Sequence, residues 1–223
     1  MLLHIPAVVG PAELEAVREL LAEARFVDGR LSAGKAARRV KHNEELEPDP
    51  RLLDRLNSMV MGPLVQHPLY QSAALPLRIA SPFYARYTPG MSYGQHIDDP
   101  VMGADERYRS DVSITVFLNP PEDYDGGELV IRGAFGDTKV KLAAGDAVLY
   151  PSSSLHRVAE VTRGERLVAV TWVQRLVRDA ARRELLHELN LAREHLLSEA
   201  PETEATAHVD HAYVNLVRMW SEV

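Results

Sequence analysis

The sequence predicts an α+β protein with a mainly β core, flanked by helices at its N- and C-terminal ends. Between residues 77 and 175, short runs rich in β-branched and aromatic residues follow one another, divided by Pro, Gly and Asp. No helical pattern separates these runs, and strands in direct succession favour an antiparallel sandwich or barrel. The chain has 223 residues, of which 46% are hydrophobic, which is enough for one sizeable core.

The N-terminal segment, residues 1–76, is expected to be helical and to pack on the core. A proline in the first turn and apolar residues at helical spacing predict a helix over 11–25. Asp49-Pro50 marks a second helix start, again followed by apolar residues at this spacing. The stretch 56–77 carries no charge, but its three prolines and its polar residues are not typical of a membrane-spanning helix.

The core domain is expected over 77–177, and six of its runs have the composition of strands. Beyond it, 178–223 returns to a helical pattern, with a last helix over about 204–221. The leucines from Leu185 to Leu197 in this C-terminal extension either pack on the outside of the barrel or form a homodimer interface, and we favour the homodimer. The six predicted strands cover 77–87, 111–119, 127–133, 138–151, 156–161 and 165–174.

Charge and composition exclude several classes of protein. The formal net charge of −7 disfavours nucleic acid as a partner, because a general basic field is missing. The absence of cysteine excludes disulfides, zinc sites built on Cys and a thiol nucleophile. The N-terminus lacks the basic start and apolar run of a secretory signal. We therefore expect a cytoplasmic protein without a membrane partner.

A candidate metal site begins in "GQHIDDP", where His96 and Asp98 are two residues apart. On a strand, residues at this spacing point to the same side, so that an imidazole and a carboxylate could reach one cation. The spacing alone is a weak signal, because His208 and Asp210 repeat it within a predicted helix, where the two side chains diverge. The neighbouring Asp99 is expected to serve a turn rather than the metal.

His156, at the start of a later predicted strand, would complete the set. Two histidines and one carboxylate form the facial triad that holds Fe(II) and leaves three positions open, for a chelating co-substrate and dioxygen. Arg166 follows ten residues later, on a largely apolar strand face, where a guanidinium requires an anionic partner. A dicarboxylate such as 2-oxoglutarate would meet both the metal and Arg166. Tyr87 is the first candidate for a hydroxyl on the same carboxylate, and Tyr93 is the second.

Three segments, "YTPGMSYGQHIDDP", "RSDVSITVFLNPPEDYDGGELVI" and "AGDAVLYPSSSLHRVAEVTRGERLVAVTW", together resemble the Fe(II)/2-oxoglutarate dioxygenases of the prolyl-4-hydroxylase type. The sequence is most similar to the bacterial PKHD-type hydroxylases, some of which are associated with iron uptake. The resemblance extends over nearly the whole chain and is strongest from 78 to 175.

The resemblance implies a double-stranded β-helix, or jelly roll, as the core. It implies Fe(II) held by His96, Asp98 and His156, and 2-oxoglutarate held by Arg166. It also implies hydroxylation coupled to the decarboxylation of 2-oxoglutarate to succinate and CO2, with molecular oxygen as a further substrate and L-ascorbate as a reductant. The hydroxylated substrate, small molecule or peptide, is not indicated. The loop 99–110, which carries mixed charges, would border the entrance.

Two other functions use the same residues. A cupin-like hydrolase or isomerase would use the three ligands with another metal, but it gives no reason for Arg166. A binding module would sense iron or 2-oxoglutarate without turning it over. Activity distinguishes these functions, whereas the fold does not.

Overall fold

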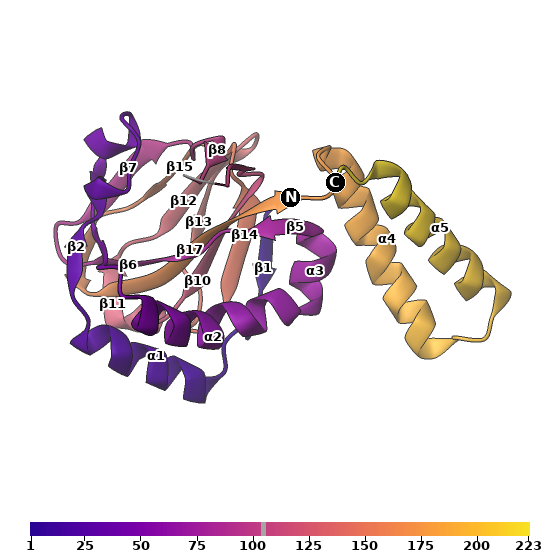
Figure 1. Ribbon diagram of the computed structural model, residues 1–223, viewed down its shortest axis with the longest axis horizontal. Helices are drawn as coiled ribbons and strands as arrows, with labels where there is room; N and C mark the ends of the chain where they lie inside the picture. The colour runs from indigo at the N-terminus through magenta and orange to yellow at the C-terminus, as the bar shows by residue number, and fades with distance from the viewer. Residues whose placement is uncertain (104–105) are drawn as a thin grey trace.

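The computed structural model describes residues 1–103 and 106–223 and shows two antiparallel sheets that face each other. Two helices cover the outer face of the larger sheet, and a helical hairpin stands to one side (Figure 1). This arrangement confirms the predicted jelly-roll core with helices at both ends. Among the described helices, none is both long and apolar enough to span a bilayer.

The larger sheet has eight strands, and every pairing in it is antiparallel. In spatial order it runs β1 (Leu3–Ile5), β14 (Ala147–Pro151), β10 (Val112–Phe117), β17 (Arg166–Arg175), β6 (Phe83–Tyr87), β4 (Glu44–Leu46) and β2 (Phe26–Asp28), with β5 (Pro76–Ile79) also paired to β17.

The smaller sheet has five strands and lies across the interior from the larger one. Its order is β13 (Gly136–Val140), β12 (Leu129–Gly133), β15 (His156–Val158), β7 (Ser92–His96) and β3 (Lys41–His42). Two further pairs of strands are separate from both sheets: β11 (Tyr124–Gly126) with β16 (Val161–Gly164), and β8 (Val101–Met102) with β9 (Tyr108–Arg109).

Strand β10 shows how the sequence separates the two faces of the larger sheet. All six of its residues are buried, and successive side chains point to opposite faces. Val112, Ile114 and Val116 pack into the core that the helices cover. Ser113 and Thr115 alternate with them and point to the interior between the sheets. The interior face therefore carries polar groups that the hydrophobic face could not accommodate.

The covering helices are α1 (Pro11–Glu23) and α2 (Pro50–Gln66), in agreement with the two predicted helix starts. Asp49 caps α2 by accepting hydrogen bonds from the first free backbone N–H groups of the helix. Helix α2 continues through Pro63, and α3 (Pro68–Ala74) follows after one residue. The uncharged stretch 56–77 is therefore mostly helical, and its apolar face is buried against the sheet.

The N-terminal segment is not solely helical, which differs from the expectation for 1–76. Four strands, β1 to β4, come from it, besides the 3₁₀ turns Gly29–Leu31 and Ala37–Arg39. Strands of two or three residues are too short to produce a pattern of alternation, and only their pairing partners define them. The division of the chain into 1–76, 77–177 and 178–223 remains a proposal.

The C-terminal extension forms a helical hairpin of α4 (Ala180–Glu199) and α5 (Glu204–Trp220), close to the predicted bounds. Leu186 packs with Leu75 and Val177, which fixes the hairpin beside α3. His187 is 6% exposed, and its Nδ1 lies 3.0 Å from the Ser72 hydroxyl on α3. The hairpin thus contacts the core through a small apolar cluster and one buried polar pair.

Acid should weaken this contact through His187. Burial lowers the pKa of its imidazole from the usual 6.5. Below pH 6.5 the unfolded chain therefore takes up a proton that the folded chain refuses, and stability falls as the pH falls. We expect His187→Gln to lose less stability than the wild type between pH 7 and pH 5, measured by urea unfolding. Equal losses in both proteins would contradict this role.

Candidate active site

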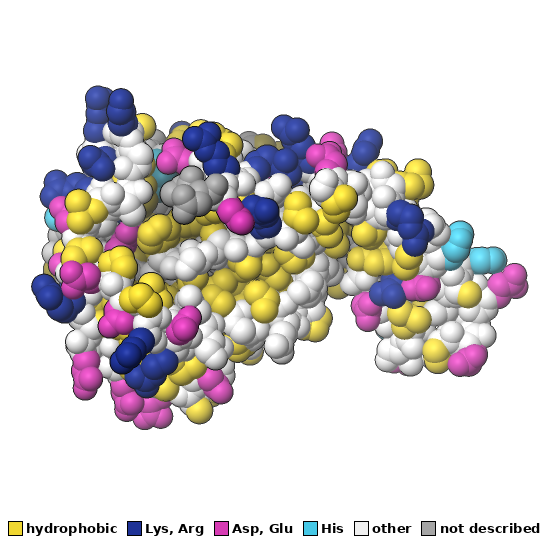
Figure 2. Space-filling model, in the orientation of Figure 1, with side chains coloured by type: hydrophobic (Ala, Val, Ile, Leu, Met, Phe, Trp, Pro, Cys, Tyr) yellow, Lys and Arg dark blue, Asp and Glu magenta, His cyan; other side chains and the backbone are white. Residues whose placement is uncertain are grey.

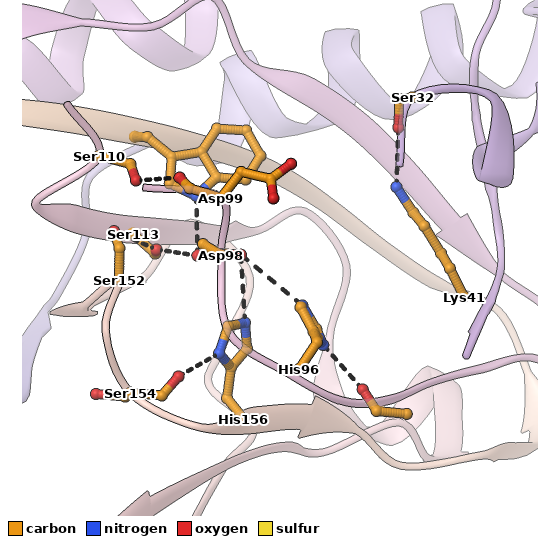
Figure 3. Close-up of polar contacts among 12 residues, drawn as sticks. Ser32, Lys41, His96, Asp98, Asp99, Ser110, Ser113, Ser152, Ser154 and His156 are labelled. Carbon is orange, nitrogen blue, oxygen red and sulfur yellow. Dashed lines mark hydrogen bonds and ion pairs between the residues drawn. The ribbon is translucent and has the colours of Figure 1, made fainter. Parts of the chain in front are cut away.

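The pairing of two neighbouring strands brings the predicted histidines together. His96 is the last residue of β7, His156 is the first of β15, and the two are direct partners in the antiparallel register. Their ring centroids are 4.2 Å apart. Asp98 follows β7 by two residues and turns back towards both rings (Figure 3). One ligand atom from each of the three side chains lies within 4.8 Å of the others.

Backbone carbonyls fix which nitrogen of each imidazole faces this centre. Nδ1 of His96 lies 2.8 Å from the Gly94 carbonyl, and Nδ1 of His156 lies 2.9 Å from that of Ser154. Since a carbonyl accepts only from N–H, each ring is protonated at Nδ1, and each Nε2 offers a lone pair. The Nε2 atoms lie 3.8 and 3.7 Å from Oδ1 of Asp98.

The low pKa of His96 suits the binding of a cation at this centre. Burial, followed by the neighbouring His156, lowers the pKa of His96 to about 4, so its imidazole is neutral at pH 7. Two imidazoles and a carboxylate, gathered on one side of a cavity, are the donor set of the facial triad. The residues present therefore fit Fe(II).

Asp98 is oriented by two donors on the opposite sheet. The Trp172 indole N–H donates to Oδ2 of Asp98 at 2.9 Å, and the Ser113 hydroxyl donates to the same oxygen. Ser113 is in turn 2.8 Å from the Ser152 hydroxyl. Oδ1 is thereby left facing the histidines. Strand pattern alone indicates neither contact, because it does not show which segment lies opposite Trp172 or Ser113.

Removal of the indole donor should loosen the carboxylate without removing it. Trp172→Phe keeps an aromatic ring but leaves Oδ2 of Asp98 with one donor fewer. Losses at such outer contacts typically reduce metal affinity by about 10- to 100-fold. We expect a weakening of about tenfold in Fe(II) binding, measured by anaerobic competition with a chelator. Phe83→Leu, which changes a ring that packs edge-on against Trp172, is the matched control and should have little effect.

A cavity of about 570 Å³ extends from the three ligands to Arg166, between the two sheets. Figure 2 shows the corresponding face of the core hollowed and lined by hydrophobic side chains. Arg166 is 1% exposed, yet no carboxylate of the described residues forms an ion pair with it, and its Nε has no hydrogen-bond partner there. A buried guanidinium in this state fits an anionic ligand that enters the cavity.

The remaining predicted residues divide between the two ends of the cavity. The Tyr87 ring centroid lies 5.0 Å from the Arg166 guanidinium, and burial raises the pKa of its hydroxyl to about 12, so the group stays a donor. Tyr93 instead stacks on His96, with ring centroids 3.6 Å apart. Asp99 is exposed and lies outside the ligand group.

The sequence also singled out a second histidine–aspartate pair and an entrance loop. His208 and Asp210 both lie on α5, where Asp210 pairs with Arg193, and they form no ligand cluster among the described residues. The predicted entrance loop contains β8 and β9, and Val101, Met102 and Tyr108 of this loop line the cavity. Residues 104–105 of the loop lie outside the described part of the chain.

Comparison with known proteins identifies the family. The 2OG-Fe(II) oxygenase superfamily matches residues 82–174, which hold all three candidate ligands and Arg166. A PKHD-type hydroxylase from Thioalkalivibrio sulfidiphilus is 54% identical over 224 residues, and the alignment covers both chains completely. The chain belongs to the PKHD-type hydroxylases. A PKHD-type hydroxylase from Pseudomonas aeruginosa is 43% identical, again over the full length of both chains.

Solved structures support the fold of this PKHD-type hydroxylase. A Trichoplax adhaerens prolyl hydroxylase in complex with a peptide fragment has a TM-score of 0.56 at 20% identity, covering 82% of this chain and 86% of that one. A Pseudomonas putida prolyl-4-hydroxylase has a TM-score of 0.51 at 22% identity, covering 78% and 92%. The family makes the chain a 2-oxoglutarate-dependent dioxygenase that uses Fe(II).

Proposed function

We propose that His96, Asp98 and His156 hold Fe(II), that Arg166 holds the distal carboxylate of 2-oxoglutarate, and that the enzyme hydroxylates a C–H bond of an organic substrate. 2-Oxoglutarate is decarboxylated to succinate and CO2 in the same cycle. The observation that carries the proposal is the buried guanidinium of Arg166, which has no ion-pair partner among the described residues and lies in the cavity that the three ligands line. When bound, Fe(II) supplies the redox chemistry between dioxygen, 2-oxoglutarate and substrate.

The protein's own contribution is to position the ligands and to exclude water. Asp98 presents one oxygen because Trp172 and Ser113 occupy the other. The planar fork of Arg166 suits a carboxylate in bidentate geometry. The Tyr87 ring lies beside this guanidinium, which supports its hydroxyl as a further donor to the same group. These fixed donors orient the co-substrate before the chemistry begins, so that little reorganisation is needed.

Three finer parts of the proposal follow from family resemblance and composition. L-ascorbate would act as a reductant that restores oxidised iron, and it should raise the number of turnovers before inactivation. The cytoplasmic location stays a prediction, which cell fractionation would test. The homodimer through the C-terminal helices also stays a prediction, supported by exposed Leu185 and Leu191 on α4. A monomer mass from scattering at micromolar protein concentration would contradict the homodimer.

The function is tested by an anaerobic titration with Fe(II) and then 2-oxoglutarate. We expect the weak visible absorption of a chelated keto acid, followed by succinate once oxygen is admitted. The absorption should be lost in His156→Ala and weakened in Arg166→Ala. Absorption without succinate, in the presence of substrate candidates, would favour the sensing module. No absorption in folded protein would favour the hydrolase or isomerase.

A further inference from the structure

A short segment, residues 41–46, closes one side of the cavity by crossing from one sheet to the other. Its first strand, β3, pairs with β7 of the smaller sheet, where Lys41 is opposite Tyr93. Its second strand, β4, pairs with β6 of the larger sheet, where Glu45 is opposite Ala85. The segment therefore places residues from one short piece of chain against both walls.

This segment turns polar side chains inward. Lys41, Asn43 and Glu45 alternate along it, all three line the cavity, and they are 9%, 3% and 8% exposed. Lys41 and Glu45 form an ion pair, and the Lys41 ammonium also donates to the Ser32 hydroxyl at 3.0 Å. A buried ion pair is weak evidence for stability, because desolvation offsets its attraction. Because this ion pair lies in the wall of an active-site cavity, we infer that it binds a ligand there.

Each polar group of this segment keeps unused bonding capacity. The Lys41 ammonium has three donors, of which Ser32 and Glu45 take two. The second carboxylate oxygen of Glu45 and Oδ1 of Asn43 have no hydrogen-bond partner within the described residues. The segment can thus offer a ligand one cationic donor and one anionic acceptor side by side.

The pair lies within reach of the metal ligands. The Lys41 ammonium sits 5.3 Å from the Tyr93 ring centroid, and Tyr93 in turn stacks on His96. In Figure 3 Lys41 stands beside the triad, on the same side as His96. A small molecule held by the pair would therefore present its other atoms to the metal site. The cavity wall beyond is largely apolar, with Phe83, Ile97, Val101, Met102 and Trp172.

We propose that the Lys41–Glu45 pair recognises the hydroxylated substrate, and that this substrate is a small zwitterion of the amino-acid type. Its carboxylate accepts from Lys41, its ammonium donates to Glu45, and its apolar part lies near the metal. A purely anionic or purely cationic substrate would meet one like charge in the pair, whereas a zwitterion matches both. This inference rests on the proposed function and specifies its substrate class.

The test compares free amino acids with their end-blocked forms. The holoenzyme with Fe(II) and 2-oxoglutarate is assayed for succinate in the presence of each common L-amino acid, or of its N-acetyl amide. We expect at least one free amino acid to stimulate succinate formation, and its blocked form to be less effective by about tenfold or more, since charge-assisted hydrogen bonds are lost. Mass spectrometry should then find that amino acid with one added oxygen.

The charge-swapped double variant Lys41→Glu/Glu45→Lys distinguishes substrate recognition by the pair from a purely structural role. It keeps an ion pair between the sheets, so the melting temperature should stay close to that of the wild type. It reverses the polarity of the pair, so stimulation by the amino acid should be lost. Stimulation that survives the swap, blocked forms that stimulate equally, or stimulation by none of the free amino acids would each overturn the proposal. Absence of the keto-acid absorption in the wild type would instead contradict the proposed function.

Discussion

Asp98→Ala should abolish hydroxylation and weaken Fe(II) binding by more than about 100-fold, beyond the effect of an outer contact. Asp98 is the one carboxylate in the ligand group, so its removal leaves only the two imidazoles as ligands. It also leaves the indole N–H of Trp172 without its buried acceptor. Metal affinity by anaerobic chelator competition and succinate formation measure the two effects.

Two comparisons separate the ligand from its surroundings. Asp98→Asn keeps an oxygen for the donors Trp172 and Ser113 but removes the negative charge, and it should lose nearly as much metal affinity as Asp98→Ala. Added formate, small enough for the space left in Asp98→Ala, should restore part of the activity. Full hydroxylation by Asp98→Ala without added carboxylate would show that the ligand assignment is wrong.

Arg166→Met should raise the KM for 2-oxoglutarate by about 100-fold or more. Breaking a buried, hydrogen-bonded charge pair costs about 3–5 kcal/mol, and each 1.4 kcal/mol is tenfold in affinity. Fe(II) binding should change little, because Arg166 lies outside the ligand group. Steady-state succinate formation, measured over a range of 2-oxoglutarate concentrations, gives the KM directly.

Stability provides an independent readout for Arg166. Without its ligand, the guanidinium is a buried charge with no ion-pair partner among the described residues, so Arg166→Met should maintain or raise the melting temperature. Arg166→Lys keeps the charge but loses the fork, and its KM should fall between those of the wild type and Arg166→Met. A marked loss of stability in Arg166→Met, with an unchanged KM, would make the arginine structural.

The sequence was sufficient to predict the core of the fold and to name residues that the structure brings together at the candidate site. Long, buried strands such as β10 and β17 carry a clear alternation, and the four residues His96, Asp98, His156 and Arg166 fall on or beside strands in a recognisable order. That alternation also placed Arg166 on an apolar face, where the structure shows it buried. These features depend on local pattern, which one sequence contains.

Other features depend on which distant segments of the chain contact each other, and a single sequence does not contain this information. Trp172 acquires its contact only because β17 lies opposite the end of β7, 74 residues away in the chain. Lys41 and Glu45 become cavity residues because two very short strands join different sheets. Lys41 stands among basic residues, 38–42, and nothing in this local sequence indicates that its side chain is buried.

The contact between Asp98 and Trp172 has a consequence for stability. The two histidines belong to the smaller sheet, whereas Trp172 and Ser113 belong to the larger one, and Asp98 connects them. A cation on the three ligands would therefore fasten the two halves of the sandwich as well as serve catalysis. A ligand that binds only the folded state stabilises it in proportion to the logarithm of its concentration. The iron supply of the cell would then affect the folding stability of this enzyme as well as its catalytic rate.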